Sequence, residues 1–344
     1  MIANRLCSLL VLFWISMPTL AAETPPSTPP SPHAIEIPSW FKESFLDLDK
    51  DIKEAAAEKK RVMLYFGQDG CPYCTKLMQV NFSQKDIVAQ MHRYYDAIAL
   101  NIWGDREVTW LDGKTRTEKE FAAFLRVQFT PTLLFIDEQG MVVLRINGYY
   151  PPHKLRAALD YVGKHMENQT PFHDYLKTAA TEPSSGKLHD EPFFLTVPHD
   201  LQRTQQLSTK PLMVLFEQKE CAECDEMHNK GFKDKYVLDL LKQFNVVRLS
   251  LFGKESLITP NGKKMTEAEW GRALNVAYTP GIVFFDTQGK EVFRVDAYLK
   301  SFHLASSLDY VASKSYLTQP NFQRFIESRA DKMRKAGIPF DIWQ

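Results

Sequence analysis

Residues 62–74 read VMLYFGQDGCPYC, and residues 212–224, which read LMVLFEQKECAEC, repeat the pattern 150 residues later. Both stretches run from an apolar segment through a short polar turn into a Cys-x-x-Cys pair. One residue is then lost, and the correspondence continues at a spacing of 149. The matched residues are Phe66, Gln68, Cys71, Cys74, Leu125, Val127, Thr130, Pro131, Phe135, Asp137, Gln139 and Gly140, with Phe216, Gln218, Cys221, Cys224, Leu274, Val276, Thr279, Pro280, Phe284, Asp286, Gln288 and Gly289. A register held over so many positions predicts one fold for both halves.

Apolar runs and turn residues predict the order β-α-β-α-β-β-α for the first copy. The predicted strands are residues 61–66, 95–102, 132–137 and 142–146, with a short extra strand at 35–37. The predicted helices are residues 41–60, a helix opening at Pro72, 117–127 and 151–165. A last helix is expected between Asn321 and Gly337, packed on the second domain.

Two short motifs sharpen this outline. Asp112-Gly113 is typical of a hairpin turn. Thr117 with Glu120 predicts a capping box at the start of a helix, and Thr266 with Glu269 repeats it in the second copy.

The N-terminus indicates export. Arg5 is followed by an apolar run at residues 6–17 and by Thr19-Leu20-Ala21, which resembles a cleavage site. A membrane anchor is the alternative, but a spanning helix needs about 20 apolar residues and Pro18 ends this run early. We expect a signal peptide at residues 1–22, so Cys7 would leave with it.

The remaining chain divides into four parts. Residues 23–34 are proline-rich and predict an extended tether. Residues 35–168 form the first predicted domain, 169–190 a linker and 191–344 the second domain. A length of 344 residues favours two domains over one.

Charge argues against a nucleic-acid partner. Lys and Arg number 42, as do Asp and Glu, so the formal net charge is zero. Phosphate backbones attract a strongly basic surface, which this composition does not supply. With 44% hydrophobic residues, the chain has the composition of an ordinary globular protein.

Both copies resemble the thioredoxin fold. In each, a predicted strand leads into Cys-x-x-Cys at the start of a helix, and a Thr-Pro pair, Thr130-Pro131 or Thr279-Pro280, comes directly before an antiparallel strand. The resemblance implies an α/β architecture of two tandem thioredoxin-like domains, each a mixed central sheet flanked by helices. It also implies cis bonds at Pro131 and Pro280, and a substrate-binding role for Thr130-Pro131 and Thr279-Pro280. FGQDGCPYC and the export signal are most similar to periplasmic SoxW-type thioredoxins, which are associated with sulfur oxidation.

The chain departs from thioredoxin next to both cysteine pairs. Thioredoxin has Trp directly before its first active cysteine and a buried Asp six residues before it. Here these positions are Gly70 and Tyr65 in the first copy, and Glu220 and Leu215 in the second. Proton transfer through a buried acid at that position is therefore not expected.

A cysteine at a helix N-terminus is stabilised as the thiolate, the form that attacks disulfides. We therefore expect Cys71 to be the exposed nucleophile and Cys74, one turn further, to resolve the mixed disulfide. Cys221 and Cys224 are the equivalent catalytic pair. Acidic neighbours of Cys221 predict a less stable thiolate and hence a more reducing pair, which would pass electrons to the first.

Other uses of the cysteines remain open. A Cys₄ zinc site normally separates its pairs by about 15 to 20 residues, far fewer than lie between Cys74 and Cys221. Cys221, Cys224 and His228 suggest a copper site, although a surface histidine is the more common reading. Haem attachment requires a histidine directly after the second cysteine, and neither copy has one. Structural disulfides are a further alternative, but a bond that closes so short a loop stabilises little.

The sequence thus predicts an exported thiol-disulfide oxidoreductase, periplasmic or otherwise outside the cytoplasm. Its expected partners are protein disulfide substrates and a membrane thiol reductant as electron donor. No cofactor and no metal are expected, and the processed chain would not span a membrane. An oxidase or isomerase, or a protein that binds a client or copper without turnover, is the alternative.

Overall fold

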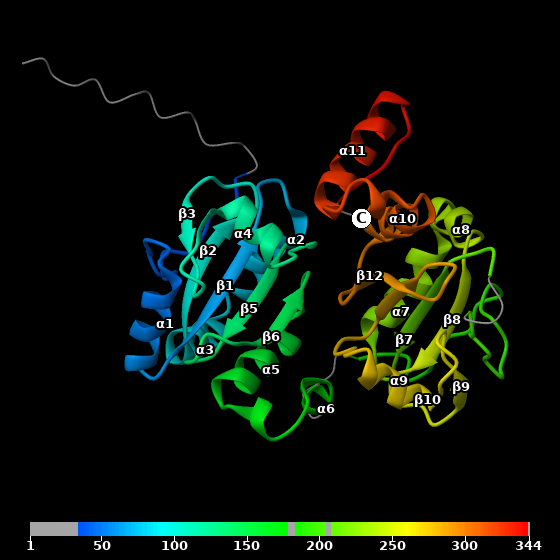
Figure 1. Ribbon diagram of the computed structural model, residues 1–344, viewed down its shortest axis with the longest axis horizontal. Helices are drawn as coiled ribbons and strands as arrows, with labels where there is room; N and C mark the ends of the chain where they lie inside the picture. Colours follow the sequence, from blue (N-terminus) through cyan, green and yellow to red (C-terminus); the bar gives the residue numbers. More distant parts are fainter. Residues whose placement is uncertain (1–33, 178–182, 204–207, 343–344) are drawn as a thin grey trace, which may run out of the picture. The chain divides into compact units, whose positions relative to one another are not determined.

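The computed structural model describes residues 34–177, 183–203 and 208–342 (Figure 1). Residues His33–Gln344 form one compact unit. The predicted signal peptide and nearly all of the tether lie outside the described residues. Within the described ranges, the helices are all too short or too polar to cross a membrane.

The first repeat is built on a four-stranded sheet in the order β2-β1-β5-β6. Strand β1 is parallel to β2 and antiparallel to β5, so the sheet is mixed. The elements are α1 (Leu48–Ala57), β1 (Arg61–Gly67), α2 (Pro72–Lys76), the π-helical turn η1 (Leu77–Asn81), α3 (Lys85–Tyr94), β2 (Tyr95–Asn101), β3 (Glu107–Thr109), β4 (Thr115–Thr117), α4 (Glu118–Phe124), β5 (Thr132–Ile136), β6 (Val142–Asn147), α5 (Pro152–Gly163), η2 (Met166–Asn168) and α6 (Phe172–Leu176).

The second repeat has the same sheet, in the order β12-β11-β7-β8. Strand β7 is parallel to β8 and antiparallel to β11. The elements are β7 (Leu212–Glu217), α7 (Ala222–Asn229), η3 (Gly231–Lys233), α8 (Lys235–Leu241), β8 (Asn245–Ser250), β9 (Ser256–Ile258), β10 (Lys264–Thr266), α9 (Glu267–Ala273), β11 (Gly281–Phe285), β12 (Glu291–Val295), α10 (Ser301–Ala312), η4 (Ser315–Leu317) and α11 (Phe322–Lys335). Two tandem mixed sheets flanked by helices are the architecture that the sequence predicted.

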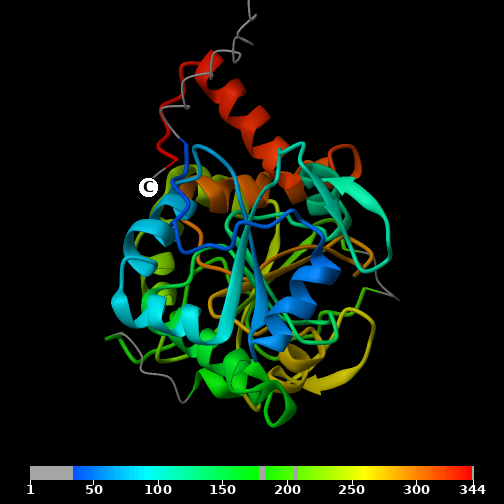
Figure 2. The same cartoon turned by 90° about the vertical axis from the view of Figure 1, so that its left-hand side faces the viewer.

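Helices cover both faces of the first sheet. Met63 and Tyr65 of β1 point to the core beneath α3 and α5, whereas Leu64 points to the core beneath α1 and α4. Figure 2 shows α1 and α3 on opposite sides of β1 and β2. Because side chains alternate along a strand and both faces are covered, β1 is buried throughout, which explains its continuous apolar run.

Most predicted elements are confirmed, including both capping boxes. Residues 35–37 are not a strand, and the helix expected at 41–60 begins only at Leu48, with Asp47 as its N-cap. The segment before it has another use: Phe41 is buried, and the Lys42 N–H donates to the Ala97 carbonyl at 2.7 Å.

Candidate redox site

Cys71 lies where the first strand of the repeat gives way to a helix. It is the N-cap residue of α2, and its Sγ accepts a hydrogen bond from the Cys74 backbone N–H at 3.1 Å. Pro72 occupies the first helical position, where the absence of an N–H costs nothing. The two cysteines form a disulfide. In the reduced protein the same N–H group would stabilise a Cys71 thiolate.

The Thr-Pro loop lies directly beside this disulfide. Cys71 Sγ is 3.4 Å from the Thr130 carbonyl oxygen. The Thr130-Pro131 and Thr279-Pro280 bonds are both cis, as the resemblance to thioredoxin implied. The structure thus brings Cys71, Cys74 and Thr130 into one site.

The second pair has the same local geometry but different surroundings. Cys221 is the N-cap of α7, its Sγ accepts from the Cys224 N–H at 3.1 Å, and the two cysteines form a disulfide. The Thr279 carbonyl, however, accepts a hydrogen bond from Lys154 Nζ of the first repeat at 3.3 Å. The backbone expected to receive a substrate strand is therefore occupied in the second repeat.

Lys154 also neutralises an acid of the second motif. Its Nζ lies 2.9 Å from Glu223 Oε1. The equivalent pair at the first motif is Tyr73 with His303, whose rings are 5.1 Å apart. Burial lowers the pKa of His303 to about 4, so this contact is uncharged at neutral pH. One motif is thus held by an ion pair and the other by a neutral aromatic contact.

The acidic neighbours of Cys221 are not the unpaired charges that the sequence suggested. Asp225 Oδ1 lies 2.6 Å from His189 Nε2, and Glu226 Oε1 lies 3.1 Å from Lys230 Nζ. Glu220 accepts a hydrogen bond from Ser184 Oγ. Because nearby partners offset these charges, the expected difference in reduction potential between the pairs becomes smaller.

Cys71, the predicted nucleophile, is less exposed than expected. Cys71 and Cys221 are each 3% exposed. The prediction of an exposed Cys71 is wrong, because Cys71 belongs to the buried core of the first repeat, against which residues of the second repeat also pack. Tyr73 takes part in that packing: its hydroxyl accepts a hydrogen bond from the Lys300 N–H at 3.1 Å.

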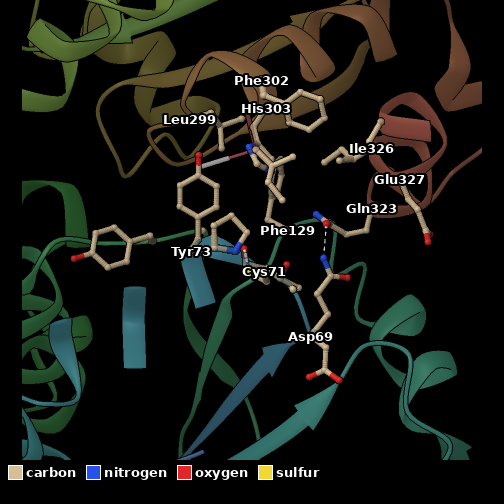
Figure 3. A pocket seen from close by; sticks show the side chains of 18 of the residues that line it. Asp69, Cys71, Tyr73, Phe129, Leu299, Phe302, His303, Gln323, Ile326 and Glu327 are labelled. Carbon is tan, nitrogen blue, oxygen red and sulfur yellow. Dashed lines mark hydrogen bonds between the residues drawn. The ribbon is translucent and has the colours of Figure 1, made fainter. Parts of the chain in front are cut away.

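A cavity of about 360 Å³ opens at Cys71 (Figure 3). The first repeat contributes its floor, including Gly70, Cys71 and Thr130. The second repeat contributes side chains of α10 and α11. In Figure 3, Leu299, Phe302 and Ile326 lie across the cavity from Asp69. The C-terminal helix, expected only to pack on the second domain, therefore also lines the first redox site.

Sequence reasoning missed a buried acid in the second repeat. Glu217, at the end of β7 and four residues before Cys221, is fully buried, and its Oε1 lies 2.9 Å from His228 Nε2. Glu191 Oε1 lies 3.0 Å from His228 Nδ1 on the other side of the ring. The first repeat has Gly67 at the position of Glu217, so it lacks this cluster.

His228 is 2% exposed, so the reading of it as a surface histidine is wrong. Burial opposes its protonation, but the hydrogen bonds and charges of Glu217 and then Glu191 outweigh burial and raise the pKa of His228. The helical spacing of His228 from Cys224 was visible in the sequence, but its two glutamate partners were not. Within the described ranges, no group of three or more His, Cys, Asp or Glu side chains is arranged to hold a metal ion.

Two tandem sheets of this topology, each with Cys-x-x-Cys at a helix N-cap and a cis-proline directly before the antiparallel strand, define a thioredoxin-type protein. A thioredoxin-like domain family model matches residues 48–163 and again 197–312. The chain therefore belongs to the thioredoxin-like domain family.

Solved structures similar to this chain include a thioredoxin-fold protein from Helicobacter pylori (17% identity, TM-score 0.34), with 38% of this chain and 89% of that one covered. A thioredoxin from Thermus thermophilus is 23% identical, with 34% and 83% covered and a TM-score of 0.27. The C-terminal domain of Neisseria meningitidis DsbD is 14% identical, with 36% and 93% covered and a TM-score of 0.25. Curated protein sequences gave no match.

Proposed function

We propose that this protein is an exported thiol-disulfide oxidoreductase that reduces protein disulfides through Cys71 and Cys74, as SoxW-type periplasmic thioredoxins do. One observation carries the proposal: Cys71 is a helix N-cap with its Sγ 3.4 Å from the carbonyl of the Thr130-Pro131 loop. The helix N-terminus stabilises a thiolate at Cys71, and the carbonyl next to the same sulfur can accept a hydrogen bond from a substrate strand.

The reaction proceeds in two exchanges. The Cys71 thiolate attacks one sulfur of the substrate disulfide, a Cys71–substrate bond forms, and the other substrate sulfur leaves as a thiolate. Cys74 then attacks Cys71 Sγ and releases the second substrate thiol. Two electrons have passed to the substrate, and Cys71–Cys74 is left as the disulfide. A membrane thiol reductant supplies the two electrons that regenerate the dithiol.

The first motif is the substrate-facing centre of this proposal. A cavity adjoins Cys71, whereas at the second motif Lys154 occupies the Thr279 carbonyl and pairs with Glu223. Cys221 and Cys224 would exchange with Cys71–Cys74 or with the donor after this contact opens. The Thr279-Pro280 loop then becomes the second binding element.

Insulin reduction by the processed chain tests the proposal. We expect the double variant Cys71→Ser/Cys74→Ser to lose turnover, while Cys221→Ser/Cys224→Ser keeps it when a dithiol is supplied directly. A protein that binds clients without turnover would show no insulin reduction in any form, and an oxidase would reduce insulin poorly. Export is tested separately by fractionation and by the N-terminal sequence of the mature chain, which we expect to begin at Glu23.

A further inference from the structure

The cavity at Cys71 is a composite of both repeats, and its second-repeat wall carries an apolar patch beside polar side chains that include His303, Gln323 and Glu327. The apolar patch consists of Leu299 and Phe302, together with Ile326 and Ala330 of α11. Phe129 of the first repeat adds another apolar side chain. An aliphatic side chain of a substrate would lose its hydration on this patch.

Helix α11 is fastened to the first repeat beside the Thr-Pro loop. The Phe322 N–H donates to Gln128 Oε1 at 3.0 Å, and Gln323 Nε2 donates to the Gln128 carbonyl at 2.9 Å. Gln68 Nε2 donates to Gln323 Oε1 at 3.0 Å. These bonds hold the apolar patch at a fixed place relative to Cys71.

Among the described residues of the first repeat, helix α11 has no counterpart of equal length. The corresponding α6 covers Phe172–Leu176, whereas α11 covers Phe322–Lys335. Ile326 is the last residue of the five that match α6 in length, and the extra turns carry Glu327, Ala330 and Arg334; all four residues line the cavity. At the second motif, Lys154 of the first repeat donates to the Thr279 carbonyl.

We propose that α11 and α10 form the specificity wall of the Cys71 site, which selects an extended peptide whose disulfide cysteine is flanked by an aliphatic residue. The proposal rests on the proposed reductase function and adds the substrate class. A cavity near 360 Å³ is at the lower end of ligand-site volumes, so it takes a segment and one or two side chains, not a folded surface. An unfolded or misfolded polypeptide offers such a segment.

The test uses the full processed chain and three disulfides. Two are short peptides, each with one intramolecular disulfide, with Leu or Ser next to the attacked cysteine, and the third is hydroxyethyl disulfide, which has no side chain. We expect Ile326→Asn to lower kcat/KM for the Leu peptide about tenfold, a typical value for a changed apolar pocket. The Ser peptide and hydroxyethyl disulfide should react at the wild-type rate.

Two further variants keep the test decisive. Ser328→Asn lies on the exposed face of the same helix and should leave all three rates unchanged. Ile326→Val keeps an aliphatic side chain and should retain the preference for the Leu peptide. Equal losses on all three substrates with Ile326→Asn, or equal wild-type rates for the two peptides, would overturn the specificity wall. Failure of the wild type to reduce even hydroxyethyl disulfide would overturn the proposed reductase function instead.

Discussion

Phe129 and Tyr278 occupy equivalent positions in the two repeats, one residue before each Thr-Pro pair, and each side chain is buried in the hydrophobic core of the other repeat. Tyr278 lies against Tyr150 with ring centroids 4.6 Å apart, and Phe129 lies 5.4 Å from Phe322. The loops that carry the substrate-binding backbone in thioredoxins thus also join the repeats. The loops next to the Thr-Pro pairs therefore contribute both to the candidate redox sites and to the packing between the repeats.

We expect Phe129→Ala to destabilise the whole chain by about 3 to 5 kcal/mol, as truncation of buried aromatic residues does. The cost arises in the core of the second repeat, so thermal unfolding should show both repeats affected by this first-repeat substitution. Phe124→Ala is the control, because Phe124 is 48% exposed, and it should change stability by less than about 1 kcal/mol. Equal effects of the two variants would contradict the interlocked packing.

Lys154→Met should make the second disulfide easier to reach. The substitution removes the hydrogen bond to the Thr279 carbonyl and the ion pair with Glu223. In a Cys71→Ser/Cys74→Ser background, we expect dithiothreitol to reduce Cys221–Cys224 several times faster, with thiol formation followed by alkylation. Lys164→Met, which removes only an exposed pair with Asp160, serves as the control. An unchanged rate in the Lys154 variant would show that this contact does not limit access.

The order of attack at the first motif follows from Cys71 as the N-cap residue. Cys74→Ser should accumulate mixed disulfides with clients, because the resolving thiol is missing, whereas Cys71→Ser should accumulate none. Non-reducing electrophoresis of freshly alkylated extracts measures both. Trapping by Cys71→Ser alone would reverse the assignment of nucleophile and resolving cysteine.

The buried His228 makes stability depend on pH. Its pKa is higher in the folded protein than in the unfolded chain, so the folded state binds the proton more tightly. Its contribution is complete below about pH 6.5, the ordinary histidine value, and is lost as pH rises through the folded-state pKa. We expect His228→Gln to destabilise the chain more at pH 6 than at pH 9, measured by urea unfolding. A loss that grows with rising pH would contradict the sign.

Much of the fold was predictable because its determinants are local. The continuous apolar run of β1 indicates that the strand is buried on both faces of the sheet. Thr117 and Glu120, three residues apart, indicate the start of a helix. Because the second half of the sequence repeats the first, the same predictions apply to both repeats. The helix predicted at 41–60 was wrong at its start, because Phe41 is buried in a non-helical segment before α1. Hydrophobic periodicity does not distinguish such a residue from one on the buried face of a helix.

The surroundings of the two motifs were not predictable. Lys154 meets Glu223 across nearly seventy residues of sequence, and α11 reaches Gln128 from the far end of the chain. Residue type and spacing do not encode such pairings. The burial of His228 was hidden for the same reason, since its partner Glu191 lies in the segment before the second repeat's sheet.

The redox state of the four cysteines in living cells tests the central claim most directly. Cells are quenched in acid, free thiols are alkylated with a mass tag, and the fractions are read by mass for the wild type and for each double-serine variant. A reductase supplied by a membrane donor predicts Cys71 and Cys74 mostly as free thiols. Cys71–Cys74 found mostly as the disulfide in cells whose donor is intact would contradict the proposed direction and indicate an oxidase.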